Sequence, residues 1–403
     1  MWMNESVRAI AERLQSGLVT SEELLLSYVS KIEASEGASS FAYLNAEEAI
    51  KAARASDARR REGKTLGVLD GIPFAAEDRF CTENMPTECN SALLEGYFPP
   101  YTADAVSRLT DVGAILLGKL RTRGFLSGEL PCEGEPSVCR AVREGFISFA
   151  LAADTGGELF RTGNCGVAVI KPANGCIPRL GMIASAPSLD GVAIVANTAE
   201  DCACVLNVFQ EESVSEQPVR VTVGWNGADA DALCKQWERA GIETKLLPIR
   251  FSEQAVTAYR ILCAVEGASE LALYDGVRFG RCSERGDDAW ERAANTRAEF
   301  FSNEEKKRIL LGTALLTGEF REKCDQTARR WREQIRAQLQ ALTAEHTILV
   351  LPQNTLSSVC GALAELSMAS VSEDMLVMSA SGEEHQMLRL LELQSREGAC
   401  GNV

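Results

Sequence analysis

The stretch FALAADTGGELF, residues 149 to 160, places a tight turn of Asp154, Thr155, Gly156 and Gly157 directly after an apolar run. Two adjacent glycines let the backbone close on a ligand and leave amide N–H groups free to point at it. The residue presented at the end of the turn is Glu158. Such a turn usually offers a nucleophile or an oxyanion hole, so the carboxylate there needs an explanation.

Outward from this turn, short apolar runs alternate with helical segments. Runs typical of strands, bounded by Gly, Pro or Lys, occupy residues 112–119, 166–172, 219–225, 243–249, 347–353 and 374–380. Helical segments are expected at 228–240, 255–275 and 318–343. This alternation predicts an α/β fold with helices on both faces of a largely buried sheet.

The first 65 residues have a helical pattern. Thr20 and Glu23 form a capping box, and Leu24, Leu25, Tyr28 and Ile32 follow at helical spacing. A second amphipathic helix is expected from Asn45 to about Glu62. The only obvious break is 210–218, which is too short for an interdomain linker. We expect one domain over 1–403, with residues 1–65 packed outside an α/β core of 66–403.

Composition excludes several classes of function. A net charge of −16 argues against a protein that grips nucleic acid directly, because phosphates require a basic face. No apolar run approaches the roughly 20 residues of a membrane span, and the N-terminus lacks a signal-peptide pattern. The fourteen cysteines are scattered, and His346 and His385 have no companion ligands. We expect a cytoplasmic protein with reduced thiols and without a metal or cofactor.

Ordered segments along nearly the whole chain resemble the amidase-signature family. They are LDGIPFAAEDRFCTENMPTEC (69–89), PPYTADAVSRLTDVGAILLGK (99–119), the turn at 154–157, CGVAVIKPANG (165–175) and SLDGVAIVANTAEDCACVLNV (188–208). Two later segments, ELALYDGVRFG (270–280) and EEKKRILLGT (304–313), resemble the A subunit of bacterial glutamyl-tRNA(Gln) amidotransferase in particular. The resemblance implies the amidase-signature fold, a mixed central sheet covered by helices on both faces.

The resemblance also implies where the family's chemistry would lie. In the family a serine after the turn attacks an amide carbonyl, a second serine on a cis peptide relays its proton, and a lysine is the base. Here the nucleophile position is Glu158 and the lysine position is Glu77. Gly134 stands at the cis-serine position, within Pro131–Val138. Asp154, Thr155, Gly156 and Gly157 would be the remnant of the oxyanion turn. The sequence therefore predicts a degenerate triad.

Other positions keep the residue found in the family, but the retained residue does not by itself indicate a reaction. Arg308 matches an arginine that contacts the substrate's α-carboxylate in the family, although a surface role on its helix is an equal alternative. Asp78 is expected to support the loop of the lost lysine. Tyr274, Asp275 and Arg278 are expected to serve packing or a partner surface. Cys165 is expected in the core. The connections 119–131 and 352–363 are shorter than in the family, which removes parts that position the substrate.

Two classes of function are consistent with the residues at these positions. The first is a catalytically inactive paralogue that acts as a scaffold for B-type and C-type subunits or for an active A-subunit paralogue. The second is an amidase or glutaminase that uses a remodelled, net-acidic cleft in which Glu77 and Glu158 share a proton. With Asp78 and Asp154 these carboxylates could also bind a hard cation. Alternatively, each glutamate is solvated or pairs with Arg79, Arg161 or Lys171. A decaying gene without a function is a third possibility.

Overall fold

The computed structural model describes residues 5–125, 134–161, 166–210, 220–344, 347–372 and 374–400. Its strands are β1 Phe41–Leu44, β2 Pro73–Glu77, β3 Ile115–Leu120, β4 Phe149–Thr155, β5 Ala168–Lys171, β6 Asp190–Ala196, β7 Arg220–Val223, β8 Glu243–Leu246, β9 Thr347–Pro352, β10 Ser367–Ser370 and β11 Met375–Ser379. In this part of the chain they form one sheet of eleven strands in the order β1-β3-β2-β4-β6-β5-β10-β11-β9-β7-β8.

The sheet is mixed. Strand β2 runs parallel to β3 and β4, and β7 runs parallel to β8 and β9. Strand β6 pairs antiparallel with both β4 and β5. The six runs predicted to be strands all coincide with strands, namely β3, β5, β7, β8, β9 and β11. The predicted α/β architecture with a mixed central sheet is therefore confirmed.

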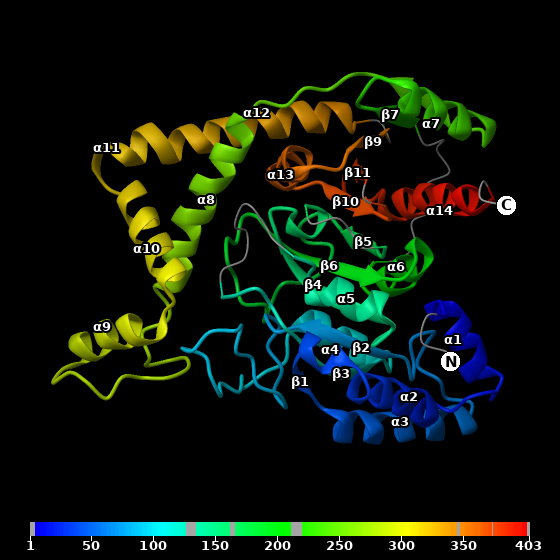
Figure 1. Ribbon diagram of the computed structural model, residues 1–403, viewed down its shortest axis with the longest axis horizontal. Coiled ribbons are helices and arrows are strands. Elements are labelled where there is room, and N and C mark those ends of the chain that lie inside the picture. The colour runs from blue at the N-terminus through cyan, green and yellow to red at the C-terminus, as the bar shows by residue number, and fades with distance from the viewer. Residues whose placement is uncertain are drawn as a thin grey trace.

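Helices surround the sheet (Figure 1). They are α1 Val7–Gln15, α2 Ser21–Glu33, α3 Ala46–Arg61, α4 Asp104–Asp111, α5 Ser137–Arg143, α6 Ala199–Leu206, α7 Ala228–Arg239, α8 Gln254–Leu271, α9 Ala289–Phe300, α10 Asn303–Leu315, α11 Gly318–Phe320, α12 Gln326–Leu342, α13 Thr355–Leu363 and α14 Glu384–Cys400, with short turns η1 Glu36–Ser40, η2 Glu158–Phe160 and η3 Arg321–Asp325. The predicted capping box at Thr20 and Glu23 is present at the start of α2.

One helix ends earlier than its pattern predicts. The segment expected at 255–275 forms α8, which stops at Leu271. Beyond it, the carboxylate of Asp275 accepts a hydrogen bond of 2.9 Å from the amide of Val277. Gly276 between them adopts a φ of 81°. An Asx turn of this kind competes with the helix for the backbone, so Tyr274 and Asp275 lie in a loop.

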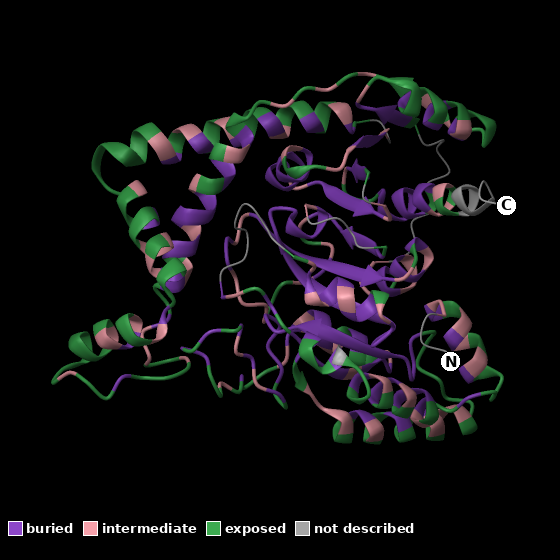
Figure 2. Cartoon of the chain, in the orientation of Figure 1, coloured by how far each residue is buried: buried purple, intermediate pink, exposed green. Residues whose placement is uncertain are grey.

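One continuous hydrophobic cluster spans the sheet and its covering helices. It includes Val205 before the predicted break and Val221 after it. Buried residues, coloured purple in Figure 2, concentrate on the strands and on the inner faces of the helices. In the described ranges, no helix is both long and apolar enough to cross a bilayer.

Helices α8 to α11, residues 254–320, form an arm that extends away from the sheet (Figure 1). Within α9 the only buried residue is Thr296, and α10 buries Glu305 and Gly312. A Cβ on Gly312 would lie 2.0 Å from the carbonyl oxygen of Ala264, so glycine is what allows α10 to approach α8. On the outer side, Trp290 is 86% exposed and Leu310 is 72% exposed. A second, smaller hydrophobic cluster lies where the arm joins the body, and it includes Tyr274.

Candidate functional site

The turn after β4 has a backbone that only glycine allows. Gly156 has a φ of 71° and Gly157 a φ of 77°. A Cβ on Gly156 would lie 2.0 Å from the ring of Tyr259, and one on Gly157 would lie 2.8 Å from the carbonyl oxygen of Ser358. The rest of β4 is buried along its whole length and pairs with β6 over seven residues. The turn is therefore held rigidly from both sides.

The turn does not leave its amides free, contrary to the expectation from the sequence. The carboxylate of Asp154 accepts hydrogen bonds from the amides of Gly157 at 2.7 Å and Leu159 at 3.0 Å. The amide of Thr155 donates to Glu158 Oε1 at 3.3 Å. Because the turn is short, the carboxylates of Asp154 and Glu158 reach backbone amides only three to five residues away. Three of the turn's amides are thus occupied by side chains of the same turn, and the amide of Gly156 donates to the carbonyl of Leu189 at 3.4 Å.

Glu77 and Glu158 line one small cavity. Glu77 ends β2, and its Oε2 accepts a hydrogen bond of 2.8 Å from the amide of Ala153. Glu158 begins η2, and each glutamate is 8% exposed. The cavity has a volume of about 20 Å³, which is room for about one water molecule. Its lining is completed by Arg121, Thr122, Arg123, Pro136, Ser137, Val138, Ala153 and Leu159. The cleft that was expected to be net-acidic is therefore a water-sized cavity in which Arg121 and Arg123 stand beside the two glutamates.

Burial governs the protonation of both carboxyl groups. Removal from water raises the pKa of Glu158 to about 7, and the charge of Asp154 acts in the same direction while Arg161 opposes it. Burial also raises the pKa of Glu77, opposed by Arg79 and by the hydrogen bond from Ala153. The charge of Glu77 also raises the pKa of Glu158, so the two acids that line this cavity are electrostatically coupled.

Arg79 provides the positive charge beneath this pair. Its side chain is fully buried, and its guanidinium donates to the carbonyl of Ile183 at 3.0 and 2.9 Å and to Thr155 Oγ1 at 3.2 Å. It lies 3.4 Å from Asp190 Oδ1. Asp190 in turn accepts a hydrogen bond of 2.5 Å from Thr155 Oγ1. Arg79 therefore ties the turn, strand β6 and the segment after β2 into one network.

Two lysines are buried near this network. Asp78 points away from Glu77 and pairs with Lys119 at 3.2 Å, and it also accepts the amides of Glu88 and Cys89 at 3.1 and 3.0 Å. Asp78 thus supports the loop that follows it. Lys171 is 1% exposed, and its stem crosses β6 at Gly191. Burial lowers the pKa of Lys171, and the charges of Asp154 and Asp190 oppose this effect. Lys171 is therefore directed at the aspartates and not at the two glutamates.

The structure does not bring the remaining predicted positions into the cavity. Gly134 is exposed, and its carbonyl accepts a hydrogen bond from Arg123. Arg308 is half-buried on α10, where its charge acts on Cys263 of α8. Tyr274 packs edge-on against Phe125 with ring centroids 4.4 Å apart. Arg278 is exposed beside Phe279, at 6.0 Å from the ring centroid. Pro131, Cys132, Glu133, Cys165 and His346 lie outside the described residues.

Several cavity residues, among them Arg121, Thr122, Arg123 and Ser137, were not singled out from the sequence. Ser137, the first residue of α5, lines the cavity together with both glutamates. Its place after Pro136 in a polar loop gave no signal of its own. His385 lies in a different cavity, beside α6 and α14. Among the described residues, no three His, Cys, Asp or Glu side chains are grouped so that they could hold a metal ion.

Comparisons with known proteins agree on one relationship. Residues 23–143 match the family model described as Amidase. The glutamyl-tRNA(Gln) amidotransferase A subunit of Moorella thermoacetica is 32% identical over 395 residues, covering 85% of this chain and 80% of its own length. Its counterpart from Nitrosococcus oceani is 31% identical over 363 residues, covering 78% and 75% respectively.

Solved structures share the fold at lower identity. A crystal structure of an amidase aligns with a TM-score of 0.77 and 21% identity, covering 98% of this chain and 100% of the other. The peptide amidase of Stenotrophomonas maltophilia aligns with a TM-score of 0.75 and 20% identity, covering 98% and 97%. At these identities the likeness concerns the fold alone, and it agrees with the predicted architecture.

Proposed function

Because this chain belongs to the amidase-signature family, with relatives among the A subunits of glutamyl-tRNA(Gln) amidotransferase, we propose that it is a catalytically inactive member with a binding or scaffold role. The observation that carries this proposal is the water-sized cavity at Glu77 and Glu158. A glutamine side chain has no room there, and neither glutamate can replace a serine that is activated by a lysine.

The chemistry of a carboxylate supports the same conclusion. Attack of Glu158 on an unactivated amide would form an anhydride, which is less stable than the amide it replaces. The amides of Thr155, Gly157 and Leu159 are already bonded to Asp154 and Glu158, so an oxyanion that used them would have to displace those bonds. Each requirement of acyl transfer therefore lacks its group.

The proposed partners follow from the relatives, which are named as subunits of a larger enzyme. A scaffold of this family would bind B-type and C-type subunits or an active A-subunit paralogue in the cytoplasm of a bacterium. It would not bind nucleic acid directly, because the chain has a net charge of −16. We propose a degenerate triad at Glu77, Gly134 and Glu158, with Asp154 to Gly157 as the remnant of the oxyanion turn and Arg308 as a remnant of substrate binding.

The test is ammonia release from glutamine and from asparagine by the purified chain, with the Moorella thermoacetica relative measured in parallel as an active reference. We expect no release above background. Glu158→Ser alone should not restore it, because a lone serine lacks its base. The triple variant Glu77→Lys, Gly134→Ser and Glu158→Ser should recover little. Turnover near ~1 per second in the unmodified chain would overturn the proposal.

The scaffold role is tested separately from the missing activity. The B-type and C-type subunits encoded in the same genome are purified and mixed with this chain, and complex formation is followed by size-exclusion chromatography with light scattering. Co-elution at a defined stoichiometry is expected. If neither those subunits nor an A-subunit paralogue binds, the chain is not a scaffold of this family, whatever its activity.

The alternative is an active amidase, and Ser137 is the observation that favours it. Its hydroxyl lines the same cavity as Glu158, whose pKa of about 7 suits a general base near neutral pH. If the chain does release ammonia, Ser137→Ala and Glu158→Gln should each abolish that release. The half-buried Ser107→Ala on α4, outside the cavity, serves as the matched control.

A further inference from the structure

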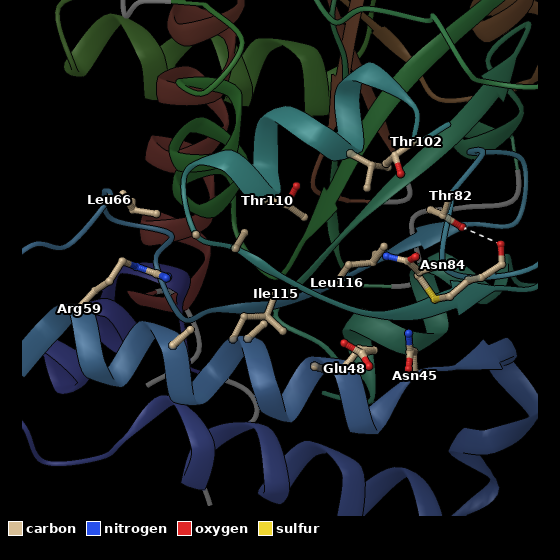
Figure 3. A pocket seen from close by; sticks show the side chains of 17 residues that line it. Asn45, Glu48, Arg59, Leu66, Thr82, Asn84, Thr102, Thr110, Ile115 and Leu116 are labelled. Carbon is tan, nitrogen blue, oxygen red and sulfur yellow. Dashed lines mark hydrogen bonds between the residues drawn. The ribbon is translucent and has the colours of Figure 1, made fainter. Parts of the chain in front are cut away.

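A second cavity, separate from the one at the glutamates, lies between α3 and α4 over the start of β3. Its volume is about 450 Å³, within the range of sites for small ligands. It shares no lining residue with the cavity at Glu77 and Glu158. In Figure 3 it extends along α3 from Asn45 at one end to Arg59 at the other.

The middle of this cavity is apolar and owes its width to small side chains. Ala49, Ala52 and Ala55 of α3 form one wall, and Val106 of α4 stands on the other side. Ile115 and Leu116 of β3 form the floor. Ala52 and Ala55 are exposed, so they contribute space and not core packing. A longer side chain at either position would fill the cavity without disturbing the fold.

One end of the cavity offers uncharged hydrogen-bonding groups. Asn45 precedes α3 at the N-cap position, where an asparagine side chain usually accepts a hydrogen bond from the first turn. Here the Asn45 side chain makes no such bond. Asn84 lies across the cavity from it (Figure 3). Neither side-chain amide is hydrogen-bonded to another residue in the part of the chain that the structure describes. Each can offer one acceptor and two donors to a ligand.

The charged groups at the rim are already neutralised within the chain. Arg59 forms a bidentate ion pair with the fully buried Asp70, with hydrogen bonds of 2.6 and 3.2 Å. Glu48 pairs with Lys51 at 2.7 Å. A charged ligand would have to break one of these pairs or enter an apolar space without a partner. The electrostatics therefore favour a ligand without net charge.

We propose that this cavity binds a small uncharged amide with an apolar body. The ligand's amide would exchange hydrogen bonds with the side chains of Asn45 and Asn84. Its apolar part would lie between Ala52, Ala55 and the floor of β3. The proposal does not depend on the inactivity proposed above, because binding here requires none of the residues at the other cavity.

The test uses N-acetyl-L-leucinamide as the probe and the full-length chain, with binding followed by ligand-observed NMR. A small ligand of this size should bind saturably with a Kd on the order of 1 mM. Two charged relatives, the anion N-acetyl-L-leucine and the cation L-leucinamide, should each bind at least about tenfold more weakly, because each would carry an unpaired charge into an apolar space.

Variants locate the site. Ala55→Leu should abolish binding by filling the cavity, whereas Ala58→Leu, on an exposed face of the same helix outside the cavity, should leave the Kd unchanged. Asn84→Leu should weaken binding by about threefold to tenfold, the effect of one or two hydrogen bonds. The proposal is overturned if the probe does not bind saturably. It is equally overturned if Ala55→Leu binds like the unmodified chain, if Ala58→Leu loses binding too, or if a charged relative binds as tightly.

Discussion

Removing the guanidinium of Arg79 should destabilise the protein more than removing any exposed arginine. In Arg79→Met the carboxylate of Asp190 loses its charge partner, and the carbonyl of Ile183 and the hydroxyl of Thr155 lose donors. Breaking a buried ion pair costs roughly 3–5 kcal/mol. Asp190 still accepts bonds from the amides of Ser185 at 2.8 Å and Ala186 at 3.1 Å, which favours the lower end of that range.

The corresponding change in melting temperature can be worked out from the chain length. An unfolding entropy of about 2.1 cal/mol/K per residue gives about 0.8 kcal/mol/K for this chain. The melting temperature of Arg79→Met should therefore fall by about 4–6 °C at pH 7, as measured by differential scanning calorimetry. Arg79→Lys retains the charge but not the forked geometry, so it should lie between that variant and the unmodified chain.

The matched control is Arg54→Met. Arg54 is 65% exposed and pairs with Glu22 on the surface at 2.7 Å, where such a pair contributes at most about 1 kcal/mol. Its melting temperature should stay within about 1 °C of the unmodified value. If Arg79→Met melts within the same 1 °C, Arg79 does not hold the turn and the sheet together, and the electrostatic account of the site is wrong.

Two further predictions concern the site's proton and the arm. Between about pH 4.5 and pH 7 the folded chain keeps the Glu158 proton that the unfolded chain has released, so this carboxyl group reduces stability as the pH rises. The stability of Glu158→Gln relative to the unmodified chain should therefore increase by about 2–3 kcal/mol from pH 4 to pH 8. A melting-temperature difference between the two proteins that does not depend on pH would show that the pKa of Glu158 is not raised. Gly312→Ala should loosen α10 from α8 and speed proteolysis within the arm, because its Cβ would lie 2.0 Å from Ala264 O. The exposed Thr313→Ala is its control, and equal cleavage of the two variants would refute the close packing.

Local patterns predicted the strands rich in β-branched residues better than those rich in alanine and serine. The runs that became β7 and β9 are rich in β-branched residues and have clear boundaries. Strand β4 reads FALAADT and β10 reads SMAS, and alanine and serine favour no strand on their own. These segments are strands because neighbours on both sides complete their hydrogen bonds, and β4 pairs with β6 over seven residues. The residues of each segment alone do not reveal which strands will pair with it.

The sequence also predicted part of the site. The prediction that Glu77 and Glu158 face each other followed from their positions in the resemblance, and both line one cavity. The volume of that cavity did not follow, because it depends on Pro136 and Val138 packing from another segment. Arg79 was named as an alternative partner of the glutamates, but arginine is rarely fully buried, so its complete burial and its bonds to Ile183 and Thr155 did not follow from the sequence. Only the three-dimensional contacts show this.

The outer helices of the arm, α9 and α10, bury few residues, and this has a consequence for cooperativity. Helix α9 buries one residue and α10 two, whereas the central strands are buried throughout. Helix α8 buries ten residues and is held by the core, but local opening requires less free energy where few apolar contacts are lost, so α9 with α10 forms a unit that opens well before the sheet. Its backbone amides should then exchange with solvent far faster than those of β4 and β6. Hydrogen exchange would accordingly resolve two levels of stability within one chain, even where calorimetry shows a single melting transition.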